Sequence, residues 1–85
     1  MKIWGKIRRD NHTVKNDTVV IHVRSAFEVE DWSEPLAALC HKLNLSRPVI
    51  LSKHVRDLEQ FSHAVFLPSD FMEPVDFDRF EIELF

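Results

Sequence analysis

The chain has 85 residues, of which 45% are hydrophobic and 29% are charged, and its formal net charge is −3. These values are typical of one small globular domain, residues 1–85, and they exclude a disordered or strongly basic chain. The only glycine, Gly5, excludes the glycine-rich loops with which P-loop and dinucleotide-binding proteins hold phosphates. The only cysteine, Cys40, excludes an internal disulfide and is typical of a reducing compartment.

The chain has no long apolar run. Its longest purely apolar stretches, 19–21 and 49–51, are far too short to span a bilayer, and we expect no signal peptide because residues 1–4 do not begin a long apolar run. We therefore expect a cytoplasmic domain of bacterial type without a membrane partner.

The first third of the chain predicts β-structure. Polar and apolar residues alternate over residues 2–9, which predicts a strand with one wet face, and Asp10-Asn11 is suited to a two-residue hairpin turn. A return strand is expected from His12, with an interruption at Asn16-Asp17. The β-branched stretch 18–24 then predicts a further strand.

A helix is expected after Ser33, a favourable N-cap residue, with one apolar stripe that ends at Asn44 in the left-handed C′ position. The stripe contains Leu36, Leu39, Cys40 and Leu43. Residues 48–52 predict a short buried strand. A second helix is expected over about 53–63, with a stripe of Val55, Leu58 and Phe61, and a last strand over 77–84.

The expected element order is therefore ββαβαβ. Each strand–helix–strand step favours a right-handed crossover, so we expect an α+β fold with a mixed β-sheet and two helices packed on it.

The histidines do not have the spacing of metal ligands. No two of them lie three or four residues apart, and we expect all five to be solvated or locally hydrogen-bonded: His12, His22, His41, His54 and His63.

Cys40 falls within an apolar helical stripe, which indicates a small buried side chain rather than a nucleophile. The acidic residues Asp70, Glu73, Asp76 and Asp78 lack the pattern of a calcium loop and are interpreted as solvated charges. We expect no catalytic residue, metal or cofactor.

The two ends of the chain differ in charge. Basic residues dominate 1–24 and acidic residues dominate 66–85. If the first and last strands are neighbours, Glu81 and Glu83 would neutralise Lys6 and Arg8. The wet faces of these strands also carry aromatic residues, so either Phe71 and Met72 cover them or another subunit does. The expected interaction surface consists of Trp4, Lys6, Arg8, Phe77, Arg79, Glu81, Glu83 and Phe85.

Three function classes follow from these patterns. The leading hypothesis is a non-enzymatic protein-interaction domain that self-associates as a homo-oligomer. The alternative is a small nucleic-acid-binding regulator that uses the basic first strand, which an isoelectric point near 5.9 disfavours. The second alternative is a metal-binding protein or minor enzyme that uses Cys40 and the histidines.

Three segments carry a resemblance: "MKIWGKI", "LSRPVILSKHVRDLEQF" and "FLPSDFMEPVDFDRFEIE". With its KIWG-like start and DFDxxEI-like ending, the chain resembles a family of short, functionally uncharacterised bacterial proteins. The resemblance covers nearly the whole chain and implies a complete protein. It implies no activity, cofactor or partner, and no functional residue is carried over from it.

Overall fold

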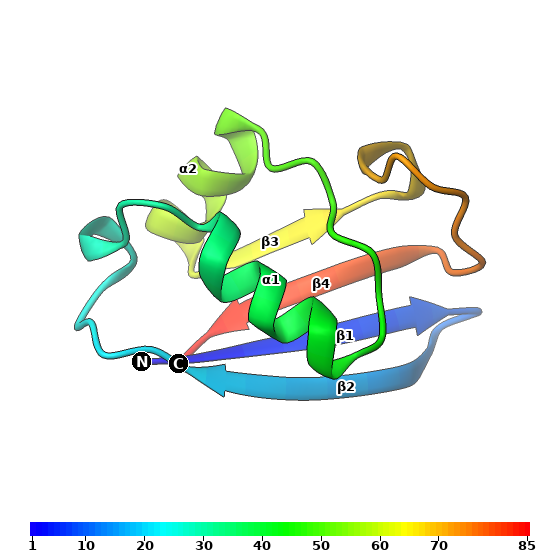
Figure 1. Cartoon of the computed structure of the whole chain (residues 1–85), viewed down its shortest axis with the longest axis horizontal. Helices are drawn as coiled ribbons and strands as arrows, with labels where there is room; N and C mark the ends of the chain where they lie inside the picture. Colours follow the sequence, from blue (N-terminus) through cyan, green and yellow to red (C-terminus); the bar gives the residue numbers. More distant parts are fainter.

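The computed structural model describes residues 1–85 and has an α+β fold with two helices packed on one sheet, as the sequence predicts. The sheet has four strands in the order β2-β1-β4-β3 (Figure 1). The strands are β1 (Lys2–Arg9), β2 (His12–Val20), β3 (His63–Phe66) and β4 (Arg79–Leu84). The helices are α1 (Ser33–Lys42) and α2 (Ser52–Phe61), and two short 3-10 turns are η1 (Ala26–Glu28) and η2 (Pro68–Asp70).

The predicted strand order is wrong in detail. The observed order is ββααββ, and every neighbouring pair of strands is antiparallel, so the sheet is not mixed. Residues 48–52 form no strand: Pro48 makes an isolated bridge with Phe71, and Leu51 serves as the N-cap of α2. Ser62 adopts a left-handed φ of 56°, which ends α2 and turns the chain directly into β3.

The β1–β2 hairpin confirms the predicted turn. Asp10 and Asn11 have φ values of 52° and 64°, as a two-residue type I′ turn requires. Lys15 lies opposite Ile7 and Thr13 lies opposite Arg8, so the extra residue of the bulge is Val14. The interruption expected at Asn16-Asp17 therefore lies at Val14 instead. One continuous strand, His12–Val20, replaces the two strands expected over 12–24.

Helix α1 packs on the centre of the sheet with the predicted stripe. Leu36, Leu39, Cys40 and Leu43 are all buried. The helix ends as predicted at Asn44, whose φ is 53°, and the N–H of Leu45 donates to the carbonyl of Cys40 at 2.9 Å in a Schellman-type ending. At the other end, Trp32 and not Ser33 occupies the N-cap position, and the N–H of Ser33, the first helical residue, donates to the carboxylate of Asp31 at 2.9 Å.

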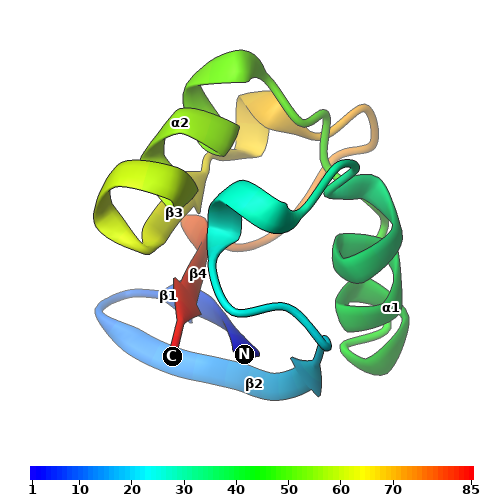
Figure 2. The same ribbon diagram turned by 90° about the vertical axis from the view of Figure 1, so that its left-hand side faces the viewer.

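The two helices cover the same side of the sheet (Figures 1 and 2). The core lies between them and the sheet, and it includes Ile3, Leu39, Phe66, Phe80 and Ile82, each with no exposed side-chain surface. The two chain ends meet at one edge of the molecule (Figure 1), where the N–H of Lys2 donates to the carbonyl of Phe85 at 2.6 Å. None of the helices has the length and apolar character that crossing a bilayer requires.

Candidate functional site

The side of the sheet that faces away from the helices is uncovered. Because side chains alternate along a strand, the odd residues of β1 point into the core and its even residues point outward. In β4 the parity is the reverse, since Phe80 and Ile82 are buried. We call the resulting surface the outer face; it comprises Trp4, Lys6, Arg8, Arg79, Glu81, Glu83 and Phe85.

Opposite charges meet on the outer face, as the sequence predicts. Lys6 lies directly across from Glu81, and its ammonium nitrogen is 2.9 Å from a carboxylate oxygen of Glu83 and 3.8 Å from one of Glu81. Partial burial acts to raise the pKa of Glu81, but the hydrogen bond and charge of Arg79, together with the charges of Lys6 and Arg8, hold that pKa below its ordinary value. The basic and acidic rows therefore neutralise each other within one chain.

The aromatic part of the outer face is the pair Trp4–Phe85. The two rings meet edge to face with their centroids 6.1 Å apart, and the ammonium of Lys6 lies 4.3 Å from the Trp4 ring centroid. The indole N–H of Trp4 donates to the side-chain oxygen of Asn16 at 3.3 Å. Trp4 is half-buried, whereas Phe85 remains 61% exposed.

Phe77 does not belong to the outer face, which corrects the expected surface. It precedes β4, is only 7% exposed, and packs edge to face on Phe71 with a centroid distance of 5.4 Å. Met72 is 88% exposed, so it does not cover the outer face. Because Phe71 is used in the core and Met72 extends into solvent, the suggestion that these two residues cover the outer face is wrong.

The free edge of β2 is protected by charged side chains. Lys42 of α1 donates to the backbone carbonyl of Thr18 at 2.7 Å, and the backbone N–H of Thr18 donates to the carboxylate of Asp17 at 2.8 Å. Lys42 and Asp17 also form an ion pair at 3.5 Å. These contacts occupy groups to which an added strand would bind, so edge-to-edge pairing is opposed at the middle of β2.

One of the five histidines, His54, is buried and locally hydrogen-bonded instead of solvated. His54 is 1% exposed and its ring stacks on Phe66 at a centroid distance of 4.1 Å. Its Nδ1 accepts the N–H of Leu51 at 2.9 Å, so a neutral ring carries its proton on Nε2, which lies 3.4 Å from the carboxylate of Asp70. Burial lowers the pKa of His54 despite the opposing charge of Asp70.

Asp70 was interpreted as a solvated charge, and this is wrong. It is 8% exposed, and its carboxylate accepts the N–H of Leu67 at 2.9 Å. The spacing of His54 and Leu58, four residues apart on one helix, was the signal that could have placed His54 on the buried side. The stripe expected to include Phe61 is displaced accordingly, since Phe61 is 70% exposed.

The chain brings together no reactive constellation around its thiol. Cys40 is 1% exposed, and burial raises the pKa of its thiol to about 11, so the thiol is protonated at neutral pH. No group of three or more histidine, cysteine, aspartate or glutamate side chains converges in a way that could hold a metal ion.

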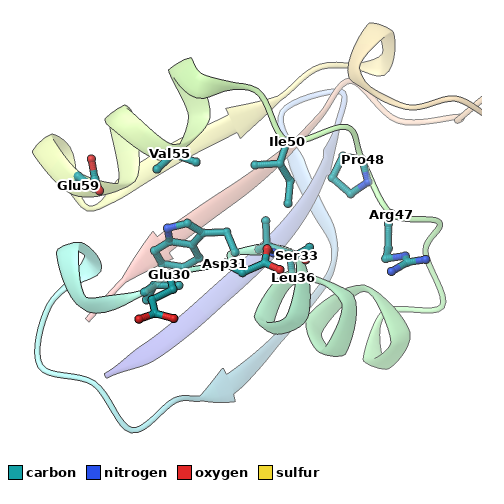
Figure 3. A pocket seen from close by; sticks show the side chains of 11 residues that line it. Glu30, Asp31, Ser33, Leu36, Arg47, Pro48, Ile50, Val55 and Glu59 are labelled. Carbon is teal, nitrogen blue, oxygen red and sulfur yellow. Dashed lines mark hydrogen bonds between the residues drawn. The ribbon is translucent and has the colours of Figure 1, made fainter.

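A groove of about 590 Å³ lies on the helical side, between the start of α1, residues 47–50 and α2 (Figure 3). Its walls include the apolar side chains of Leu36, Ile50 and Val55. Its charged lining consists of Glu30, Asp31, Arg47 and Glu59. Trp32 also lines the groove, although no sequence pattern marked this residue.

Searches with protein-family models, among curated proteins and among solved structures found no match to this chain. The chain presents two surfaces to a partner or ligand, the outer face and the groove.

Proposed function

We propose that this chain is a non-enzymatic protein-interaction domain that self-associates through its outer face. The observation that carries the proposal is an uncovered sheet side with the Trp4–Phe85 aromatic pair on it. Water on this apolar area is unfavourable by about 25 cal/mol per Å². Small domains commonly reduce such exposure by forming oligomers.

The charge rows make the outer face complementary to a second copy of itself. A two-fold axis parallel to the strands, between β1 and β4, places the β1 row of each copy over the β4 row of the other. Lys6 of one copy then lies over Glu81 of the other, because these residues are already register partners within one chain. The same arrangement brings Arg8 near Arg79, a like-charge contact that limits affinity. We therefore expect a reversible, moderately weak dimer.

A dimer interface of ordinary size would need the whole outer face. A standard interface buries roughly 800 Å² per partner. That area is about one-seventh of the 5433 Å² exposed by this chain, more than the Trp4–Phe85 pair alone can supply. Val20, which lies across from Lys2 and is 60% exposed, extends the apolar end of the face.

A nucleic acid is the alternative occupant of the same surface. It is disfavoured here because a phosphate that approaches Lys6 also meets the carboxylates of Glu81 and Glu83. A protein partner with both charge signs, such as a second copy, does not encounter this repulsion.

We also infer a reducing, cytoplasmic setting for this interaction. The only cysteine, Cys40, is a buried free thiol and takes part in no cross-link.

Sedimentation of the purified chain at micromolar concentrations tests the proposal. The unmodified protein is expected to show a concentration-dependent dimer, and Phe85→Ser is expected to shift it toward monomer. Phe61→Ser is the matched control, because Phe61 is 70% exposed but belongs to α2, on the opposite side of the sheet from the outer face. A monomer at every concentration, or an equal effect of both variants, would overturn the proposal.

A further inference from the structure

The groove on the helical side is separate from the outer face and has the features of a second binding site. Its volume of about 590 Å³ lies in the range of 300–1,000 Å³ that is usual for ligand sites. It lies between α1 and α2 on the covered side of the sheet (Figure 3), so a ligand there does not compete with a partner on the outer face.

Trp32, a buried tryptophan, forms part of the wall of the groove. Trp32 is 3% exposed and lines the groove, yet its indole Nε1–H has no hydrogen-bond partner in the chain. This nitrogen is closed to solvent, so the indole ring and not its N–H meets a ligand in the groove. The other tryptophan, Trp4, already donates to Asn16 and has no such deficit.

The charges of the groove are unequally distributed. In Figure 3, Glu59 and Arg47 lie at opposite ends of the groove, with Val55, Ile50 and Pro48 between them. Glu30 lies toward the Glu59 end in the same view. The exposed carboxylate of Asp31 accepts two hydrogen bonds from Ser33, and these lower its pKa and keep it anionic at neutral pH.

We infer that the groove binds a short extended peptide segment with a basic residue at one end, apolar residues in the middle and a carboxylate at the other end. The basic residue lies at the Glu30–Glu59 end, and the carboxylate lies at Arg47. The apolar residues contact Leu36, Ile50 and Val55, beside the indole ring of Trp32. A peptide is the occupant that supplies an apolar middle and two opposite charges in one extended molecule.

A nitrogen–proton correlation spectrum of the whole chain tests this inference, because the indole N–H groups of Trp32 and Trp4 give separate signals. The probe is a pentapeptide with blocked ends, containing lysine, leucine, alanine, leucine and glutamate in that order. We expect the Trp32 signal to move in a saturable way with a Kd of about 1 mM or lower, while the Trp4 signal stays in place.

Two variants identify the charges that matter. Glu59→Lys is expected to raise the Kd about tenfold or more, because the peptide lysine then meets a like charge. Glu34→Lys is the matched control, since Glu34 lies in the first turn of α1 without lining the groove, and the Kd should change little. A second peptide with glutamate in place of lysine should bind the unmodified chain more weakly.

The inference is overturned if the peptide leaves the Trp32 signal unchanged at millimolar concentration, if both peptides bind equally, or if free leucine alone produces the same shift. The last outcome would identify a small zwitterionic ligand instead of a peptide. The result is independent of self-association, because a dimer on the outer face changes the Trp4 signal with protein concentration.

Discussion

Gly5 determines how closely helix α1 can approach strand β1. A Cβ atom at this position would lie 2.6 Å from Cδ2 of Leu39 and 3.0 Å from Cε1 of Phe80. Its backbone φ is not positive, so the requirement is for space and not for an unusual backbone conformation. The absent side chain is what lets α1 pack closely on the centre of β1.

Gly5→Ala should therefore destabilise the fold. We expect a loss of about 1–3 kcal/mol in the free energy of unfolding, because the added methyl group overpacks the core. Urea denaturation measures this loss. In a Leu39→Val background the same change should be less unfavourable, since the clashing Cδ2 atom is then missing. Strictly additive effects would show that the contact with Leu39 is not what excludes a side chain.

His54 links stability to pH. Burial places its folded-state pKa below the ordinary 6.5, so the unfolded chain binds more protons than the folded chain in the window below 6.5. The stability that the neutral, buried His54 contributes is fully present above pH 6.5 and is lost as the pH falls below 6.5. The charges of Asp70, Lys53 and Asp57 also act on the ring, but burial is the largest effect.

We expect the free energy of unfolding to fall by up to about 1.4 kcal/mol per pH unit below 6.5 in the unmodified chain. His54→Gln should flatten this slope, because glutamine can still accept the N–H of Leu51 in a capping box but does not titrate. Urea midpoints measured between pH 7.5 and 5 in both proteins provide the check. Parallel slopes would exclude His54 as the titrating group.

At the scale of elements, the pairing of β1 with β4 joins the two ends of the chain. Lys6 and Glu81 lie opposite each other in this pairing, and their side chains are only 14% and 15% exposed. An ion pair sheltered in this way is screened less by solvent than a surface pair.

Glu81→Lys should lower the free energy of unfolding by about 0.5–2 kcal/mol, because like charges then lie across the strands. Adding Lys6→Glu should recover part of the loss, and only part, since Arg79 and Glu83 stay in place beside the exchanged charges. Asp76→Lys, in the exposed pair with Arg9, is the control and should change stability by less than about 0.5 kcal/mol. A double variant no more stable than Glu81→Lys would show that the pair does not act as a unit.

At the scale of the whole molecule, one sheet separates two surfaces of different character. The helices bury one side of the sheet and form the groove there, whereas the other side keeps its charged rows and aromatic pair (Figures 1 and 2). The contacts at Thr18 oppose edge-to-edge pairing along β2. Self-association and peptide binding can therefore be tested separately in the same chain.

The sequence by itself determined the features that depend on neighbouring residues. The Asp10-Asn11 turn, the buried stripe and Asn44 ending of α1, and the alternation of β1 and β4 were all predicted correctly, because local sterics and side-chain periodicity control them. The alternation also identified the outer face, apart from Phe77.

Only the tertiary structure decided the features that depend on distant residues. The apolar run 48–51 forms no strand, and the shorter segment His63–Phe66 takes the edge position beside β4. The side chain of His54 is buried because α2 places it on Phe66 of β3, 3.4 Å from the carboxylate of Asp70. The groove likewise combines residues of two helices and a loop. Sequence patterns record local periodicity, whereas these contacts depend on which segments meet, and that is set by packing of the whole chain.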